Sequence, residues 1–235
     1  MQTKRFWLGR AFCAVLSGVA ILFCSIATAA PVIVNSSFEA ETFNVFPGYC
    51  ADNGPITGWT GSDYAGLNPG ASFGPFIDNG LIPDGEQVAF LQVPELGDPP
   101  TTLSQTVGGF QIGAQYMVRF HANSREAYRT DPDGLTVLGA SLTVMMDAQT
   151  LIDELLVLPV EASGSHTQPY HVIATPSFVA SAETMTLSFI NPQVGGDTTL
   201  LLDQVTIEPV PEPATLALLA LGGLALGRRR RSEYP

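Results

Sequence analysis

Basic residues are scarce in this chain, and most of them lie at its two ends. Ten Lys and Arg residues stand against 22 Asp and Glu residues, so the formal net charge at pH 7 is −12. Three of the ten precede residue 11, and four form the run 228–231. The part between them has only Arg119, Arg125 and Arg129, which gives it a net charge of about −17. We therefore expect no nucleic-acid partner, because nucleic acid requires a basic surface.

Cysteine is almost absent. The chain has three cysteines, and two of them, Cys13 and Cys24, lie in an N-terminal apolar stretch. Cys50 is alone in the rest of the chain, so no intramolecular disulfide is expected there. Because no Cys-His pattern surrounds Cys50, an unpaired loop thiol is favoured over a nucleophile.

Motifs of catalysis are also missing. The three histidines, His121, His166 and His171, have no metal-ligand spacing, and the chain has neither an H-E-x-x-H nor a G-x-S-x-G motif. We therefore expect no catalytic residues and no enzyme activity. A carboxylate pair such as Glu86 and Glu126 stays open as an alternative, because a glycosidase needs only two carboxylates.

Residues 1–29 have the three parts of a secretory signal. These are a basic start, an apolar run and a small-residue site: Lys4, Arg5 and Arg10, then residues 11–26, then Ala27-Thr28-Ala29. Cleavage after Ala29 is expected, with export across the inner membrane by Sec-type machinery. A retained N-terminal anchor is the alternative. A lipoprotein signal through Cys24 is disfavoured by the bulky Phe23 before it.

The C-terminus has an apolar run that is closed by a basic cluster. Pro211 and Pro213 lie in the linker 209–213 and end the preceding fold. Residues 214–227 are Ala, Leu and Gly apart from Thr215, and as a helix they measure roughly 21 Å against a hydrocarbon core of about 30 Å. The basic tail 228–235 begins with four cations that should stay on the cytoplasmic side: Arg228, Arg229, Arg230 and Arg231. A buried core helix is the alternative for such a short run.

These C-terminal residues resemble the PEP-CTERM protein-sorting signal. The matching parts are the motif Val210-Pro211-Glu212-Pro213, the short apolar helix and the terminal arginines. The resemblance implies a protein of a Gram-negative bacterium that makes extracellular polysaccharide. It also implies an exosortase-type transpeptidase as partner, which processes the tail near the Pro-Glu-Pro motif. The tail then serves as an address that anchors the protein in the membrane at least transiently.

Residues 30–208 have the pattern of one all-β domain. Short alternating apolar runs are separated by Gly, Pro, Asn and Asp, which is typical of an antiparallel β-sandwich. Residues 87–93 are apolar at both parities and predict a central strand. In residues 116–123 the positions of Tyr116 and Phe120 define one face, and those of Arg119 and His121 define the other. Further strands are predicted at 103–107, 142–146, 151–157, 185–190 and 200–207, with a turn at 147–149.

The order of short motifs along this domain is similar to that of galactose-binding-like jelly rolls, the fold of many carbohydrate-binding modules. The matching segments are Asn35-Ser36-Ser37-Phe38-Glu39, Thr57-Gly58-Trp59, Asp84-Gly85-Glu86-Gln87-Val88, Leu103-Ser104-Gln105-Thr106-Val107 and Leu202-Asp203-Gln204-Val205. Because a fold does not fix a function, the resemblance implies a jelly-roll-like sandwich and no particular ligand.

Asp203 shares its strand parity with Val205 and Ile207, which are expected to face the core. An inward carboxylate must be paired, hydrogen-bonded or bound to a cation. Members of the similar fold often hold a structural calcium beside the first and last strands. The resemblance implies that Glu39 and Asp203 are calcium ligands here, together with backbone carbonyls. The alternatives are a β-bulge that turns Asp203 outward and a local hydrogen bond.

Two loops are candidate ligand surfaces. Residues 43–83 are rich in aromatic rings that either contact sugar or fill the core, the second being favoured: Phe46, Tyr49, Trp59, Tyr64, Phe73 and Phe76. Residues 123–134 contain Arg125, Tyr128 and Arg129, which either contact an acidic polysaccharide or pair with nearby carboxylates, again the favoured alternative. Asp131-Pro132-Asp133-Gly134 is interpreted as a turn.

The sequence therefore predicts an exported protein of the cell envelope or extracellular matrix, with a non-catalytic sandwich that binds glycan or adheres to it. Two alternatives remain: a structural matrix protein without a specific ligand, and a secreted glycan-active enzyme.

Overall fold

The computed structural model describes residues 30–70, 80–95, 97–125, 128–130, 136–161, 166–192 and 197–211. The expected signal helix and the C-terminal apolar helix lie outside these residues. Within the described ranges, no helix has the length and apolar character needed to cross a membrane.

The described part of the chain is built almost entirely of strands. One short helix, α1 (Cys50–Asn53), precedes β2. The strands, in chain order, are β1 (Thr60–Gly61), β2 (Ala65–Pro69), β3 (Gln87–Val93), β4 (Thr101–Gly108), β5 (Gln115–Ser124), β6 (Tyr128–Thr130), β7 (Thr136–Leu138), β8 (Ala140–Met146), β9 (Gln149–Val157), β10 (His171–Ala174), β11 (Phe178–Val179), β12 (Thr184–Asn191) and β13 (Thr198–Pro209).

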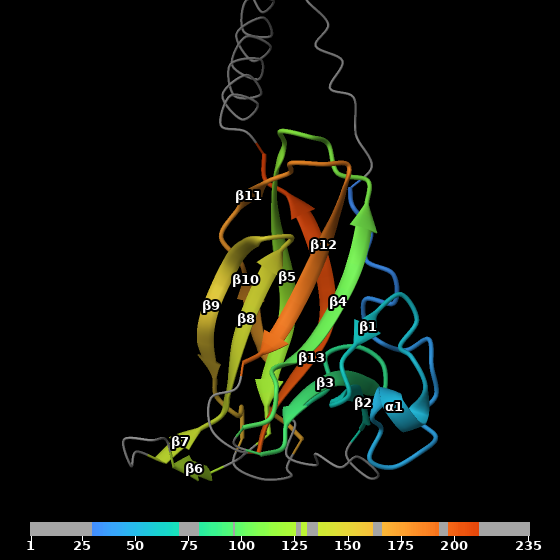
Figure 1. The fold of residues 1–235 in the computed structure, drawn as a ribbon, viewed down its shortest axis with the longest axis vertical. Coiled ribbons are helices and arrows are strands. Elements are labelled where there is room, and N and C mark those ends of the chain that lie inside the picture. Colours follow the sequence, from blue (N-terminus) through green and yellow to red (C-terminus); the bar gives the residue numbers. More distant parts are fainter. Residues whose placement is uncertain are drawn as a thin grey trace, which may run out of the picture.

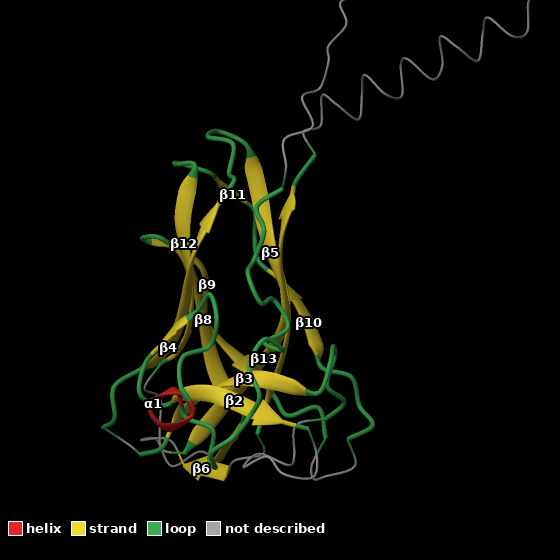
Figure 2. Cartoon of the chain, turned by 90° about the vertical axis from the view of Figure 1, so that its right-hand side faces the viewer, coloured by secondary structure: helices red, strands yellow, loops and turns green. Residues whose placement is uncertain are grey.

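Two antiparallel sheets pack face to face (Figures 1 and 2). The five-stranded sheet has the order β1-β4-β12-β8-β9, and the six-stranded sheet has the order β10-β5-β13-β3-β2, with β11 also paired to β5. The strands β6 and β7 form a separate pair. The predicted all-β antiparallel sandwich is therefore confirmed.

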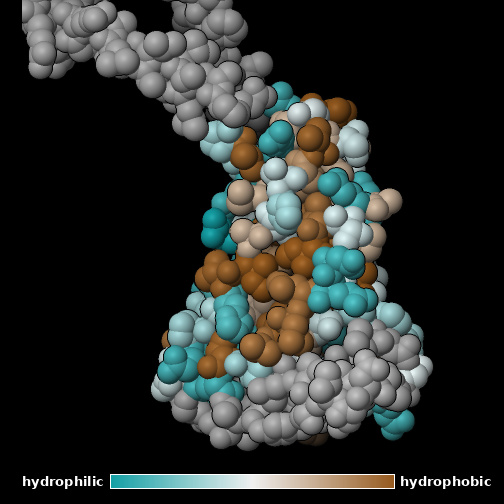
Figure 3. Space-filling model, turned by 90° about the vertical axis from the view of Figure 1, so that its left-hand side faces the viewer, coloured by the Kyte–Doolittle hydropathy of each residue, from teal (hydrophilic) through white to brown (hydrophobic). Residues whose placement is uncertain are grey.

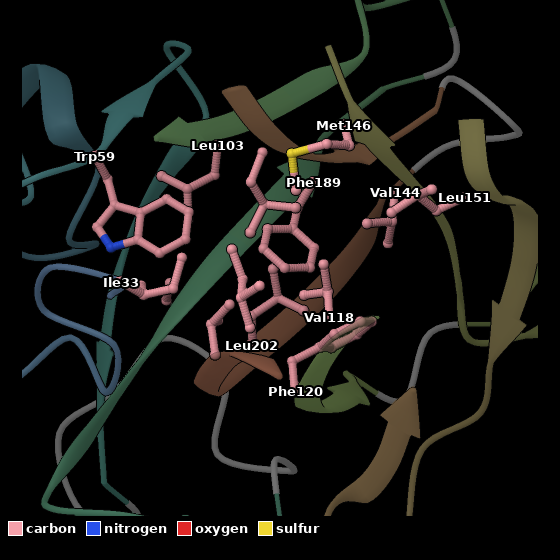
Figure 4. Packing of buried hydrophobic residues seen from close by; sticks show 14 of the residues in the cluster. Ile33, Trp59, Leu103, Val118, Phe120, Val144, Met146, Leu151, Phe189 and Leu202 are labelled. Atoms are coloured by element: carbon pink, nitrogen blue, oxygen red, sulfur yellow. The ribbon is translucent and has the colours of Figure 1, made fainter. Parts of the chain in front are cut away.

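The core lies between the two sheets and follows from alternation along the strands. In β5, Tyr116, Val118, Phe120 and Ala122 are buried between the sheets, as predicted, whereas Arg119 is exposed. Phe120 meets Phe189 of β12 edge to face, with ring centroids 5.0 Å apart. Figure 4 shows these two rings among aliphatic side chains from both sheets.

The predicted strands all occur, with ends that differ by a few residues. The central strand 87–93 coincides with β3, and every residue of β3 is buried. The predicted turn is shorter than expected, because Gln149 already belongs to β9 and pairs with Met146. Asp147, with φ 51°, makes the turn and accepts a hydrogen bond at Oδ1 from the Thr186 N–H.

The outer faces of the two sheets differ. On the six-stranded sheet, Val88, Phe90, Tyr170 and Leu201 form a second small core beneath connecting segments; we call this the covered face. The outward positions of β4 and β12 hold mainly hydroxyl side chains that are half-buried or exposed: Thr102, Ser104, Thr106, Thr184, Thr186 and Ser188. We call this the open face.

Candidate functional site

A short loop beside the covered face is held by two acidic side chains that are far apart in the sequence. Glu39 accepts hydrogen bonds at Oε1 from the N–H groups of Glu86 and Gln87, each 2.9 Å long. Asp203 accepts one at Oδ2 from the N–H of Asp84, also 2.9 Å long. Both expected calcium ligands therefore contact the same loop, residues 84–87, which connects to β3.

Asp203 is fully buried but does not share its side of the sheet with Val205 and Ile207, so the expected parity is wrong. The register of β13 against β5 shifts between Asp203 and Thr206, and Gln204 adopts φ 48°. This β-bulge, one of the two alternatives, places Val205 and Ile207 in the main core and Asp203 opposite His121 on the covered face. The other alternative also holds, because Asp203 accepts at Oδ1 from the Gln204 N–H at 2.7 Å.

The Asp203 carboxyl is in an environment that disfavours its charge. Burial raises the pKa of Asp203 to about 7, because the ionised form loses its hydration. The N–H groups of Gln204 and Asp84 lower this pKa, and the nearby carboxyls of Asp84 and Glu39 raise it. The carboxyl therefore changes its protonation state close to neutral pH.

Backbone carbonyls beside Glu39 are also occupied. The Gln87 side-chain amide donates from Nε2 to the Phe38 carbonyl at 2.6 Å and to the Glu41 carbonyl. Gly85, with φ 76°, allows close approach, because a Cβ there would lie 2.3 Å from Glu39 Oε1. A calcium ion using these carbonyls would have to displace the Gln87 amide. No group of three or more His, Cys, Asp or Glu side chains able to hold a metal occurs among the residues that the structure describes.

A cavity of about 810 Å³ opens next to this loop. Its apolar lining comes from Phe43, Pro69, Leu81 and Ile82. Its polar lining includes three carboxyl side chains and one imidazole: Glu39, Glu41, Glu86 and His166. Its size is typical of a small-ligand site, and it combines an aromatic ring and aliphatic groups with several hydrogen-bond acceptors.

The candidate aromatic rings of residues 43–83 have divided roles. Trp59 is buried in the main core, where its ring centroid lies 5.3 Å from that of Phe38. Tyr49 packs against the second core and donates its hydroxyl to Gln92. Phe46 is 68% exposed. Phe73 and Phe76 lie outside the described residues. The favoured interpretation, rings that fill the core, is therefore confirmed for Trp59 and Tyr49.

Two arginines of the sandwich are paired with carboxylates. Arg125 donates from Nη1 to Asp197 Oδ1 at 3.1 Å, and Arg119 donates from Nε to Glu208 Oε1 at 3.0 Å. The pairing favoured for Arg125 is thus confirmed. Arg129 lies in β6, and the turn at 131–134 falls outside the described residues.

The histidines do not gather into a catalytic group. His166 lines the cavity, whereas His171 contacts the Leu158 carbonyl through Nε2 at 3.0 Å. His121 lies on β5, where burial lowers its pKa and Arg119 lowers it further. Glu86 lines the cavity, but its suggested partner Glu126 lies outside the described residues. The expectation of no enzyme activity stays a prediction.

Cys50 is a free, half-buried thiol, as the sequence indicated, but it lies in the short helix α1 and not in a loop. Burial raises its pKa, which keeps the thiol protonated at neutral pH. It lines a smaller cavity of about 330 Å³ together with Trp59 and Asp63.

Sequence reasoning missed several residues of the cavity and its loop. Phe43 was the first residue of the candidate loop 43–83 but was not among its candidate rings. Leu81 and Ile82 had no periodic pattern around them. Gln87 belongs to a predicted strand and to a matching short segment but had no assigned role, although a polar side chain at the start of a mostly apolar strand is a signal that its amide has a buried partner.

The C-terminus matches a known sorting signal. Residues 209–231 match the model of the PEP-CTERM protein-sorting motif. The chain carries this motif. The match covers the four residues Val210 to Pro213 and the four arginines that were predicted to belong to it, and it indicates export to the envelope or the extracellular space.

Solved structures resemble the sandwich at low sequence identity. A cyclase from Fischerella sp. TAU is 17% identical with a TM-score of 0.53, covering 78% of this chain and 100% of that chain. The Stig cyclase Fisc from the same organism is 16% identical with a TM-score of 0.52, covering 77% and 98%. A carbohydrate-binding module, CBM4, is 17% identical with a TM-score of 0.41, covering 76% and 100%. At these identities the cyclases show the fold alone. No curated protein sequence matches the chain.

Proposed function

We propose that this chain is an exported protein, sorted by an exosortase-type transpeptidase, whose sandwich binds an uncharged glycan in the envelope or extracellular polysaccharide matrix. The observation that carries the proposal is the cavity of about 810 Å³ beside loop 84–87, in a chain that has a sorting motif at residues 209–231.

The lining of the cavity supports a sugar as its ligand. A sugar ring has an apolar face of C–H groups and a rim of hydroxyls. Phe43, Leu81 and Ile82 supply apolar contact, and the carboxyl groups of Glu41 and Glu86 are acceptors for hydroxyl donors. Acidic lining in an acidic chain repels an anionic polymer, so the proposed ligand is a neutral glycan.

The proposal includes a structural calcium ion beside Glu39. The carbonyls of Phe38 and Glu41 already converge on one donor, the Gln87 amide, and Glu39 lies next to them. Calcium prefers carboxylate and carbonyl oxygens, so the ion would replace the amide at these oxygens. Asp203 would then act from the far end of loop 84–87, through its hydrogen bond to the Asp84 N–H.

Binding is tested with a glycan array probed by protein that ends at Val210. The proposal expects binding to neutral glycans, and a flat array favours the alternative of a structural matrix protein. Release of reducing sugar from the host's own polysaccharide would favour a glycan-active enzyme instead.

Sorting is tested separately, in the host. Changing Pro211 and Pro213 to Ala should alter the processing and location of the full chain.

A further inference from the structure

The sandwich is open along one side, where the two sheets end without joining. β9 and β10 are the outermost strands of their sheets and pair only with β8 and β5. Between them the core reaches the surface through Ile152 and Ile173, which are partly buried against it. Leu155 and Leu158 flank them and are 40% and 49% exposed. We call these four residues the edge strip. Figure 3 shows the apolar band on this side of the molecule, between hydrophilic flanks.

The sorting tail leaves the sandwich near one end of the edge strip. β13 runs to Pro209, and the Val210 N–H donates to the Gln115 carbonyl at 2.8 Å, at the start of β5. Within the six-stranded sheet, β13 is two strands from β10, which is about 10 Å. Val179 of β11 lies beside Gln115 and is also exposed, so apolar surface extends to the point where the tail begins.

The length of the tail matches the length of this surface. From Gln115 to Ala122, which is opposite His171, β5 spans seven residues or about 23 Å. His171 contacts the Leu158 carbonyl and so marks the far end of the edge strip. The apolar run 214–227 measures about 21 Å as a helix.

We propose that the sorting tail, before it enters a membrane, docks on the edge strip of its own sandwich. The apolar run 214–227 covers the edge strip from Ile152 to Leu158. Each apolar surface removes the other from water, which is favourable in proportion to the area covered. A bilayer competes for the same run, so insertion or removal of the tail uncovers the strip.

The test is amide hydrogen exchange on the full exported chain in detergent-free buffer, in the monomeric fraction identified by light scattering. The reference is the same chain with Leu218→Asp and Leu219→Asp in the tail. Docking predicts that the amides of residues 152–158 and 171–174 exchange about tenfold more slowly in the unsubstituted chain. Detergent micelles, which take up the tail, should abolish this difference.

Two further variants locate the contact. Leu158→Asp, at an exposed position of the edge strip, should remove the protection, whereas Val45→Asp, an equally exposed apolar position outside the strip, should leave it unchanged. Equal exchange rates with and without the tail substitutions would overturn the proposal. Protection confined to a dimeric fraction would also overturn it, because a second copy would then cover the strip.

Discussion

The two outer faces of the sandwich have the same strand architecture but opposite surroundings. On the covered face, segments from distant parts of the chain close over Val88, Phe90 and Leu201 and bury them. On the open face, Ser104 pairs across the sheet with Ser188, and both are only half-buried. Of two sheets of similar size, one is therefore covered by connecting segments, and the other exposes a layer of hydroxyl side chains to water.

The difference shows where this fold can build a site. A sheet alone offers a shallow surface, whereas connecting segments laid over a sheet create depth and bring remote residues together. Glu39, loop 84–87 and Asp203 meet only because the N-terminal segment, the start of β3 and the bulge of β13 adjoin on the covered face. The proposed glycan cavity lies against the same loop.

The largest expected contrast comes from removing a buried side chain on the covered face. Leu201→Ala should lower the free energy of unfolding by about 2–5 kcal/mol, because it leaves a cavity in the second core. Ile190→Ala on the open face, which is half-buried, should cost about 1 kcal/mol or less. Urea unfolding of both variants measures the difference. Equal losses would mean that the covering segments add no stability.

The next contrast is in pH dependence. The pKa of folded Asp203 is about 7, above the unfolded value of about 3.9. A raised acid pKa contributes stability that is fully present below the unfolded pKa and is lost as pH rises through the folded pKa. Asp203 should therefore reduce stability between about pH 4 and pH 7, by up to a few kcal/mol.

This dependence is measured as Tm across that pH range. Asp203→Asn cannot ionise but keeps an oxygen acceptor, so the decline from pH 4 to pH 7 should be smaller in this variant. Asp197→Asn, on the exposed ion pair with Arg125, is the control and should change the profile little. Parallel profiles for the unsubstituted chain and Asp203→Asn would contradict the buried, titrating carboxyl.

Calcium should produce a smaller stabilisation, which depends on residues beside the covered face. Adding calcium to metal-free protein is expected to raise the Tm, by about 2–4 °C for each 1 kcal/mol of binding free energy in a domain of this size. Glu39→Gln should remove the shift, whereas Asp153→Asn on β9 should keep it. The absence of a shift in the unsubstituted chain would dispose of the calcium site.

The smallest contrast compares a Thr→Val substitution on the covered face with a Thr→Val substitution on the open face. The Thr199 hydroxyl is buried and has no hydrogen-bond partner among the described residues, so Thr199→Val should stabilise the protein by about 1 kcal/mol. Thr186→Val on the open face, where water reaches the side chain, should stay within about 0.5 kcal/mol of zero. Chemical unfolding of the two variants provides the comparison.

Much of the fold was predictable from the sequence, because local pattern determines it. Burial on both faces of β3 followed from apolar residues at both parities of the strand, and the alternation in β5 followed from Tyr116 to Ala122. The parity of Asp203 was not predictable with certainty, because one extra residue at a bulge reverses every later position. The positive φ of Gln204 has no signal in a sequence that lacks glycine there.

The sorting motif was predictable in full and the cavity was not. The motif is contiguous, so Pro211, Pro213 and the four arginines identify it directly. The cavity combines Phe43, Ile82 and Glu86, which are brought together only by tertiary packing. Such a juxtaposition of irregular segments leaves no periodicity in the sequence.

The most direct test of the account is the affinity for a glycan selected on the array, measured by titration calorimetry for two phenylalanine variants. Phe43 lines the cavity, whereas Phe46 is exposed and is not part of its lining. The account predicts that Phe43→Ala weakens binding at least about tenfold and that Phe46→Ala binds like the unsubstituted protein. Equal affinity of both variants, or loss of binding in Phe46→Ala alone, would contradict the cavity on the covered face as the glycan site.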